Sequence, residues 1–316
     1  MKRDSRVRRR LKLRDLDTLA AVARHASMAK AAAHLSISQP AVSKAIAEME
    51  QVLGVRLLDR SAQGVEPNLY GRALLKWATA VFDDIDQGVK EIEFLADPTK
   101  GELRVGATEP VVAGLLPAVL ERLHARHPQI CIHAKQVVTS AELSQDLRER
   151  NFDLIIGRVA KPMADDIDAE ILFHDPIFVV AGLKNRWTHR RKIALAELTN
   201  ETWVLPPLDT VLGLVIAEAF RANGLVVPRA NVVTLTLHLY TALMAKGYLA
   251  IWPGSMLHFS AKRLGLKALP VDLPMHPWPV AIMTLKHRTI SPVARLFIEC
   301  VREAAGPLAK GRWNGK

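Results

Sequence analysis

Three polar side chains between Ser38 and Ala47 have the chemistry to contact DNA. Gln39, Ser43 and Lys44 lie on one side of a predicted helix whose other side is apolar. Amide, hydroxyl and ammonium groups suit base edges in the major groove and phosphate oxygens. The pattern therefore predicts a helix in which these three residues select the DNA sequence.

A second group of polar residues lies at the ends of predicted strands, where a small ligand could bind. Thr108 lies where a strand meets a helix beginning near Pro110, and a hydroxyl with free N–H groups there forms an anion site. Arg158 ends another strand and could pair with a carboxylate in the same cleft. The alternative is that Thr108 only caps a helix and Arg158 forms a surface ion pair.

Weaker candidates for the same cleft precede other predicted helices, where each could simply be a cap. They are Thr139, Ser140 and Thr236. Glu109 argues against an anion site, because a carboxylate beside Thr108 repels an anion unless it points away.

The elements that position the first group form a helix-turn-helix at about Met28 to Ala47. Ser27 suits the N-cap of an alanine-rich helix, and Ser38 with Pro40 begins the next helix. The apolar stripe of this second helix consists of Val42, Ile46, Met49 and Leu53. A preceding helix at 13–26 completes a core, and the second helix is placed to enter a major groove. Two packed helices of an ordinary α-rich domain are the alternative.

Two further features extend this N-terminal module. A turn at 61–68 between short strands predicts a wing, which places Arg60 and Gln63 near the phosphate backbone. From the N-cap Asn68, a long helix runs to Leu95 with apolar positions at alternating three- and four-residue spacings. These positions are Ala78, Val81, Ile85, Gly88, Ile92 and Leu95. We predict that this helix forms a coiled-coil dimer.

The net charge of +11 is unevenly distributed over the 316 residues. Residues 1–76 contain 15 basic and 7 acidic residues, whereas residues 77–97 contain one basic and six acidic. The remainder contains 27 basic and 19 acidic residues. A basic head followed by an acidic helix fits a module that binds a polyanion.

The sequence also predicts a cytoplasmic protein. The basic start MKRDSRVRRR lacks the apolar segment of a signal peptide, and no apolar run is long enough to span a membrane. We expect Cys131 and Cys300 to be buried free thiols, consistent with a reducing compartment.

From Gly101 onward, predicted strands and helices alternate. This order is typical of an α/β fold with parallel sheets covered by helices. Predicted strands at 103–107, 130–134 and 152–158 are separated by helices at 110–126 and near 143–147. A second set follows, with strands near 177–181, 203–205, 232–235, 249–252 and 279–285, and helices near 211–222, 237–245 and from 291. Two αβ lobes of this kind leave a cleft at the strand ends.

The chain resembles the LysR-type transcriptional regulators from about Leu13 to Ala305. The most specific part is Ser27–Ala32, Leu35, Ser38–Ile46, Glu50, Leu53–Gly54, Leu57–Arg60 and Gly71. A narrower likeness, to regulators of aromatic-acid catabolism or sugar uptake, rests on the Gly64–Gly71 wing and Ile156–Arg158. Met28 replaces the usual aromatic residue, and Pro67-Asn68 replaces a Leu-Thr pair. Neither departure removes a type of DNA contact.

The resemblance implies a winged helix-turn-helix, a linker-helix dimer and two αβ lobes like those of periplasmic solute-binding proteins. It also implies a dimer or tetramer on a pseudo-palindromic duplex DNA site, with half-sites roughly 10 bp apart, and RNA polymerase as a further partner. A carboxylate or sugar-type effector would switch transcription. The implied DNA-binding residues are Ser27, Met28, Ser38, Gln39, Pro40, Ser43, Lys44, Arg60 and Gln63.

The predicted domains are a flexible basic arm (1–12), the winged helix-turn-helix (13–70), the linker helix and hinge (71–100), the effector-binding domain (101–305) and a tail (306–316). The arm could touch phosphates, although a solvated tail is favoured. The competing class is an enzyme or cytoplasmic small-molecule-binding protein that uses the N-terminal module only for association. The sequence contains no convergent nucleophile or acid–base set, and His124 with His127 lacks further metal ligands. We therefore expect no catalytic activity, cofactor or metal.

Overall fold

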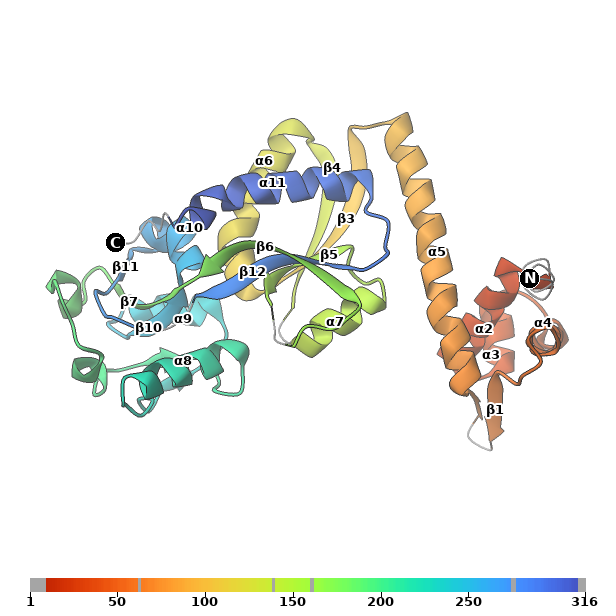
Figure 1. The fold of residues 1–316 in the computed structure, drawn as a ribbon, viewed down its shortest axis with the longest axis horizontal. Coiled ribbons are helices and arrows are strands. Elements are labelled where there is room, and N and C mark those ends of the chain that lie inside the picture. Colours follow the sequence, from red (N-terminus) through yellow and green to blue (C-terminus); the bar gives the residue numbers. More distant parts are fainter. Residues whose placement is uncertain (1–9, 62–63, 138–139, 160–161, 274–276, 312–316) are drawn as a thin grey trace. The chain divides into compact units, whose positions relative to one another are not determined.

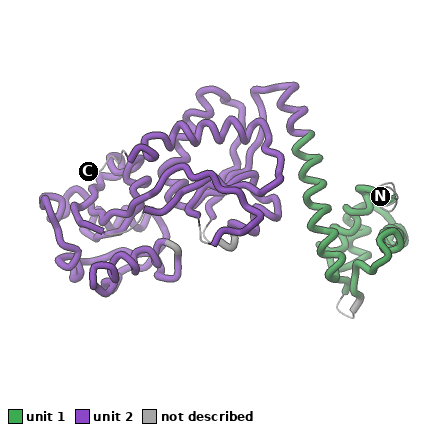
Figure 2. Tube along the Cα trace, in the orientation of Figure 1, with its two compact units in different colours: residues 1–88 green, residues 89–316 purple. Residues whose placement is uncertain are grey.

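The computed structural model describes residues 10–61, 64–137, 140–159, 162–273 and 277–311. The chain divides into two compact units, Met1–Gly88 and Val89–Lys316 (Figure 2). Helix α5 (Leu69–Ala96) contributes residues to both units, and each unit is described separately. Most of the predicted basic arm, together with Gln63 and Thr139, lies outside the described residues.

In the first unit, here called the head, the described residues before α5 form three helices followed by a hairpin. The helices are α2 (Leu13–His25), α3 (Met28–His34) and α4 (Gln39–Leu53), and the hairpin pairs β1 (Leu58–Ser61) with β2 (Gly64–Pro67). Their apolar side chains form one core, which includes Leu16, Leu19, Val22, Val42, Ile46, Met49 and Leu57. The predicted winged helix-turn-helix is confirmed.

The start of α5 is fixed to this core by an N-cap and a close backbone approach. Asn68 Oδ1 accepts hydrogen bonds from the N–H groups of Tyr70 (2.9 Å) and Gly71 (3.1 Å). A Cβ atom at Gly71 would lie 2.2 Å from the carbonyl oxygen of Leu57, so only glycine fits there. Ala78 is buried in the head core rather than exposed on the predicted dimer seam.

The second unit begins with a lobe built on a five-stranded sheet of order β4-β3-β5-β12-β6 (Figure 1). The strands are β3 (Lys100–Ala107), β4 (Gln129–Gln136), β5 (Leu154–Arg158), β6 (Ile167–Asp175) and β12 (Trp278–Leu285). Helices α6 (Leu116–Arg126) and α11 (Pro292–Ala309) cover one face, and α7 (Ser140–Arg148) covers the other. Strands β3, β4 and β5 are parallel to one another, as predicted, whereas β12 returns antiparallel to β5 and β6, so the sheet is mixed.

The second lobe is built around β7 (Ile177–Gly182), which pairs antiparallel with β10 (Ala250–Pro253) and β11 (Leu266–Ala268). A short parallel pair joins β8 (Val204–Leu205) to β9 (Val232–Val233). The helices are η2 (Arg186–His189), η3 (Leu195–Leu198), α8 (Val211–Ala222), α9 (Leu237–Met244) and α10 (Gly254–Leu264). Elements β6, β11 and α10 were not predicted from the sequence.

The helix predicted over 110–126 is divided by a π-helical turn. Segment η1 (Val111–Leu115) precedes α6, and the N–H of Leu116 donates to the carbonyl oxygen of Val111. Pro117 explains the division, because it has no N–H for the Ala113 carbonyl and its ring would clash with that group. The Oγ of Ser260 donates to this carbonyl instead, at 3.1 Å.

The prediction that both cysteines are buried is wrong for Cys131. Cys300 lies in the core of the first lobe, but Cys131 is exposed. Strand β4 pairs only with β3, and Ile130 turns toward the core. Because successive side chains of a strand point to opposite faces, Cys131 points outward. Among the described residues, no helix has the length and apolar character to cross a membrane.

Candidate DNA-reading surface and effector cavity

The N-terminal end of α4 presents the polar side chains predicted to read DNA. Ser38 Oγ accepts a hydrogen bond from the N–H of Ala41 at 3.3 Å and so caps the helix. Gln39 and Lys44 are exposed and Ser43 is half-buried, while Val42 faces the core. This arrangement leaves the amide and the ammonium group available to a ligand.

The remaining predicted DNA-binding positions have mixed surroundings. Ser27 caps α3 by accepting from the N–H of Lys30 at 3.3 Å, and Pro40 is exposed in the first turn of α4. Met28 is buried in the head core, so its side chain holds the helices together and is not part of the DNA-reading surface. The backbone of Arg60 pairs with Val65 in the hairpin, which forms the predicted wing.

In the second unit, a cavity of about 140 Å³ lies where strands of the first lobe face the second lobe. Thr108 follows β3 and Arg158 ends β5, and both line it. The opposite wall comes from α9, β10 and the segment before α8. The apolar lining consists of Pro110, Val137, Leu143, Pro206, Leu212, Leu235, Leu237, Ile251, Trp252, Pro253 and Met256. The polar lining consists of Thr108, Glu109, Gln136, Arg158, Thr210 and Tyr240.

Arg158 is a buried cation with unused hydrogen-bonding capacity. Its side chain is 9% exposed, and Nη2 lies 3.9 Å from Oδ2 of Asp175, beyond hydrogen-bond distance. Nε and Nη2 have no hydrogen-bond partner among the described residues. Burial lowers the pKa of Arg158, and the nearby Asp175 carboxylate partly offsets this effect. A second anion in the cavity would supply the missing acceptors. Arg158 is therefore not a surface ion-pair partner.

Asp175 lies at the end of β6, where the chain first crosses between the lobes. Burial raises its pKa, which Arg158 and the hydrogen bonds of Ser255 partly lower again. Oδ1 accepts from the N–H of Ser255 at 2.9 Å, and Oδ2 accepts from the Ser255 hydroxyl at 2.7 Å. The carboxylate is therefore held mainly by α10, which leaves the Arg158 guanidinium incompletely paired.

Thr108 lies beside Arg158, and both line the cavity. A Cβ atom at Gly157 would lie 2.7 Å from Cγ2 of Thr108, so glycine allows the threonine to pack directly on β5. Three positions of the following turn offer no free N–H group to a ligand. Val111 and Val112 donate to the carbonyl oxygen of Thr108, at 2.9 and 3.0 Å, and Pro110 has no N–H. Arg158, whose Nε and Nη2 have no hydrogen-bond partner among the described residues, is therefore the stronger of the two candidates for contact with an anion.

Tyr240 and Glu109 are two further polar groups of the cavity. The hydroxyl of Tyr240 is buried without a hydrogen-bond partner among the described residues, and burial raises its pKa. Sequence reasoning missed this residue, because a tyrosine on an apolar helix resembles a core residue. Burial also raises the pKa of Glu109, and the nearby His238 partly offsets this increase.

Of the weaker candidates, Thr139 lies outside the described residues, and Thr236 is not among the described residues that line the cavity. Thr236 precedes α9 without a side-chain cap hydrogen bond, although its neighbours Leu235 and Leu237 both line the cavity. Ser140 is the first residue of α7. In the described part of the chain, no three His, Cys, Asp or Glu residues form a group that could hold a metal ion.

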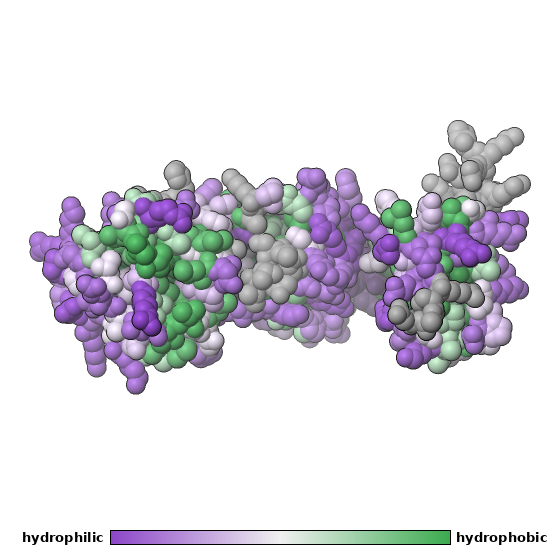
Figure 3. Space-filling model, turned by 90° about the horizontal axis from the view of Figure 1, so that it is seen from below, coloured by the Kyte–Doolittle hydropathy of each residue, from purple (hydrophilic) through white to green (hydrophobic). Residues whose placement is uncertain are grey.

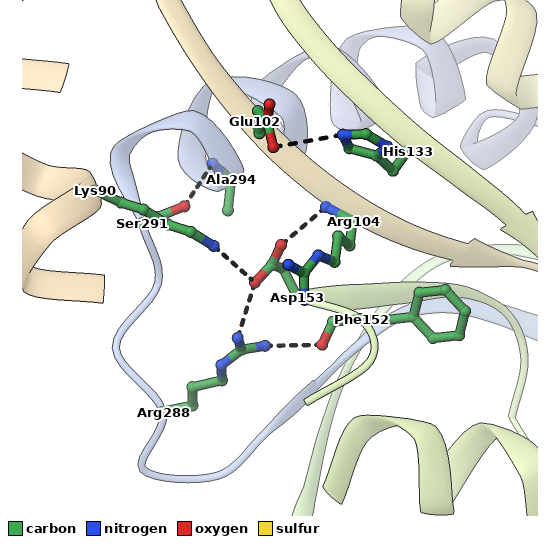
Figure 4. Close-up of polar contacts among 9 residues, drawn as sticks. All are labelled: Lys90, Glu102, Arg104, His133, Phe152, Asp153, Arg288, Ser291 and Ala294. Atoms are coloured by element: carbon green, nitrogen blue, oxygen red, sulfur yellow. Dashed lines mark hydrogen bonds and ion pairs between the residues drawn. The ribbon is translucent and has the colours of Figure 1, made fainter. Parts of the chain in front are cut away.

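A polar network connects the sheet of the first lobe to the end of α5 (Figure 4). Asp153 Oδ2 accepts from the N–H of Arg104 at 2.8 Å, and Oδ1 accepts from Nη2 of Arg288 at 2.8 Å. Nη1 of Arg288 donates to the carbonyl oxygen of Phe152 at 2.8 Å, and Lys90 Nζ on α5 lies 4.0 Å from Asp153. Asp153 therefore links β3, the loop after β12 and α5.

A winged helix-turn-helix joined by a long helix to a two-lobed domain with a polar–apolar cavity defines a ligand-responsive DNA-binding protein. Residues 13–72 match the bacterial regulatory helix-turn-helix protein, lysR family, and residues 96–306 match the LysR substrate binding domain. The chain belongs to the LysR family of DNA-binding transcriptional regulators, which carry an effector-binding domain. Because these proteins are regulators, the enzyme alternative is excluded.

Curated relatives match over nearly the whole chain. The HTH-type transcriptional regulator GbpR of Azospirillum brasilense is 29% identical, covering 94% of this chain and 87% of the relative. PcaQ of Agrobacterium fabrum is 29% identical, covering 98% and 100% respectively.

Solved structures share the fold. CbnR complexed with its target DNA is 24% identical with a TM-score of 0.52, covering 93% of this chain and 100% of that chain. A full-length OxyR variant from Pseudomonas aeruginosa is 23% identical with a TM-score of 0.62, covering 95% of each chain.

Proposed function

We propose that this regulator responds to a small carboxylate with an apolar body, bound in the cavity between its two lobes. The observation that carries the proposal is Arg158, a buried guanidinium whose Nε and Nη2 lack hydrogen-bond acceptors. An unsatisfied buried polar group costs free energy, which a ligand carboxylate would recover by accepting from the guanidinium.

The cavity lining favours an apolar acid over a sugar-type effector. Apolar side chains such as Trp252, Ile251 and Met256 supply most of the lining. They continue toward the surface, because Leu235 lines the cavity and is 40% exposed. Figure 3 shows apolar side chains gathered over α8 on the same lobe. A sugar would leave many hydroxyl groups against these side chains without partners, at a cost for each.

For DNA, we propose that Gln39, Ser43 and Lys44 contact base edges and phosphates in a major groove. The exposure of Gln39 and Lys44 at the start of α4 supports this role. Lys44 Nζ lies 3.8 Å from Glu48, a weak surface pair that a phosphate can replace. Ser27 and Ser38 contribute by holding the helix ends.

We further propose a dimer formed through α5, whose two heads read a pseudo-palindromic site. Four seam residues are exposed on this helix: Val81, Ile85, Ile92 and Leu95, from 38% to 73%. Exposed apolar residues at this spacing are typical of a coiled-coil surface. Assembly into a tetramer and contact with RNA polymerase extend this proposal. Ile85→Asp should shift the purified protein toward a monomer in analytical ultracentrifugation. Asp84→Asn should leave the mass of the assembly unchanged.

The effector proposal is tested by gel shift on the DNA upstream of the protein's own gene. The panel contains small aromatic and aliphatic carboxylates, the primary amide of each, and neutral sugars. We expect at least one carboxylate to change the position or affinity of the complex, while its amide has no effect. A response to sugars or to amides alone would contradict a carboxylate effector.

A further inference from the structure

We propose that a basic patch on the second lobe binds the phosphate backbone of duplex DNA outside the sequence that the head reads. The patch is formed by exposed basic residues from three segments. They are Lys184, Arg186, Arg190, Arg191, Lys192, Lys246, Lys262, Arg263 and Lys267.

Hydrogen bonds bring these three segments together at one end of the lobe. The N–H of Leu183 donates to the carbonyl oxygen of Gly265 at 2.9 Å, next to Arg263 and Lys267. Nδ2 of Asn185 donates to the carbonyl oxygen of Gly247 at 2.9 Å, beside Lys246. Segments 184–192, 245–247 and 262–267 therefore meet around η2, the end of α9 and the α10–β11 corner.

The patch holds most of the excess positive charge of residues 98–316. Its nine basic residues have three acidic residues beside them: Glu197, Glu201 and Asp272. The rest of these residues carry 18 basic and 16 acidic side chains, so charge is nearly balanced elsewhere. Such a concentration attracts an anionic partner over a distance comparable to the Debye length.

Much of this charge is not neutralised within the protein. Arg186 pairs with Glu201, and Arg190 pairs with Glu197 at 3.3 Å. Among the described residues, Arg191, Lys192 and Arg263 have no ion-pair partner. Their charges are therefore available to phosphate groups.

Two arginines of the patch lie over a buried tryptophan ring, and a hollow lies between two of its lysines. The guanidinium carbons of Arg186 and Arg190 lie 5.3 and 5.8 Å from the ring centre of the buried Trp187, which limits their motion. Between Lys184 and Lys246 lies a hollow of about 540 Å³, lined in part by glycine. Arginine forks suit phosphate oxygens, and the patch offers no base-reading helix. We therefore assign it sequence-independent contacts.

Duplex DNA is the polyanion that the chain already binds through its head. It carries one charge per about 1.7 Å of axis, which suits a patch with charges on three adjacent segments. This inference is independent of the effector, because the patch shares no residue with the cavity.

The test compares two probes: a short duplex limited to the site of the head, and a long duplex with flanking DNA on both sides. The variant is Arg191→Glu/Lys192→Glu in the full-length protein, and the affinity is measured over a range of salt concentrations. The affinity constant K falls as salt rises, and each lost phosphate contact makes the slope of log K against log salt less steep by about 0.9. We expect the slope to decrease by roughly 2 on the long probe and to remain unchanged on the short probe.

The matched control is Arg295→Glu/Lys310→Glu, which makes the same charge change at two exposed positions, one on α11 and one at its C-cap. On the long probe, the proposal predicts that this control changes the salt slope less than the patch variant does. An unchanged slope in the patch variant, or equal losses in both variants, would overturn it. Normal DNA binding with lost activation in a reconstituted transcription assay would also overturn it, because the patch would then serve an acidic protein. A loss of affinity for the short probe in the patch variant would show that the substitutions affect binding by the head, and would contradict a separate DNA-binding surface.

Discussion

The DNA-reading surface of the head and the effector cavity both present polar groups, but in opposite environments. Gln39 and Lys44 lie on one turn and a half of a single helix and are exposed to water. Arg158 and Tyr240 come from segments 82 residues apart and are buried. At the head, water can satisfy the exposed amide and ammonium groups in the free protein, and we propose that DNA takes its place. In the cavity, the unsatisfied groups carry a cost in the free protein, and a matching ligand removes it.

The largest expected effect is loss of the effector response in Arg158→Gln. Removing one partner of a buried charged hydrogen bond costs about 2–5 kcal/mol in binding. We therefore expect at least a roughly 30-fold weaker effector response in gel shift, with DNA affinity in the absence of effector retained. Arg148→Gln, at an exposed arginine of the same lobe, is the matched control and should respond normally.

This substitution also leaves Asp175 without a cation, which destabilises a buried carboxylate. The pKa of Asp175 should then rise further, because Arg158 lowers it in the native protein. Arg158→Gln/Asp175→Asn removes both charges and should restore thermal stability without restoring the response. A response recovered in this double variant would contradict the role of Arg158.

The second prediction concerns the exposed polar side chains of the head. Gln39→Ala should weaken specific DNA binding by about 1–3 kcal/mol with little change on random DNA. The melting temperature should be unchanged, because Gln39 is exposed. Gln51→Ala, at an exposed glutamine later in the same helix, should bind as tightly as the native chain. Equal losses on specific and random DNA would show that Gln39 does not read bases.

Tyr240→Phe should have a smaller effect that differs in sign between stability and binding. The hydroxyl is buried without a partner, so its removal should leave the unligated protein equally stable or more stable by about 1 kcal/mol. The effector should bind about 5- to 10-fold more weakly if this hydroxyl donates to it. Thermal unfolding with and without effector measures both quantities. Unchanged effector affinity would remove Tyr240 from the site.

The smallest expected effect is a pH dependence due to Glu109. Burial raises the pKa of this carboxyl group, and a bound anion would raise it further. Protonation of Glu109 then favours the anionic effector, so its affinity should increase as the pH falls toward the raised pKa. Glu109→Gln should bind more tightly at neutral pH and should lose this dependence in fluorescence titrations. A pH dependence retained in Glu109→Gln would show that another group is responsible.

The head surface comes from one short stretch of chain and the cavity from distant segments, and this difference explains what the sequence could predict. The helix-turn-helix is encoded locally, by the caps Ser27 and Ser38 and by an apolar stripe at helical spacing. The cap at Asn68 and the helix at 211–222 were likewise predicted from nearby residues and are confirmed. The two-lobed α/β class followed from the alternation of strands and helices.

Features that depend on contacts between distant segments were not predicted. Strand β12 runs antiparallel to β5. The sequence could not show this direction, because a buried strand has the same apolar pattern in either orientation. The role of Pro117 depends on Ser260, which lies on a helix that was not predicted. Arg158 was proposed from its place at a strand end, but its burial beside Asp175 and the contribution of Tyr240 require the fold.

The central claim is that Arg158 selects a carboxylate effector, and it is tested most directly by one calorimetric comparison. The tightest-binding carboxylate and its primary amide are titrated into the native protein and into Arg158→Gln/Asp175→Asn. We predict a preference for the acid of about 30-fold or more in the native protein and nearly equal affinities in the variant. The same preference in both proteins would contradict the claim.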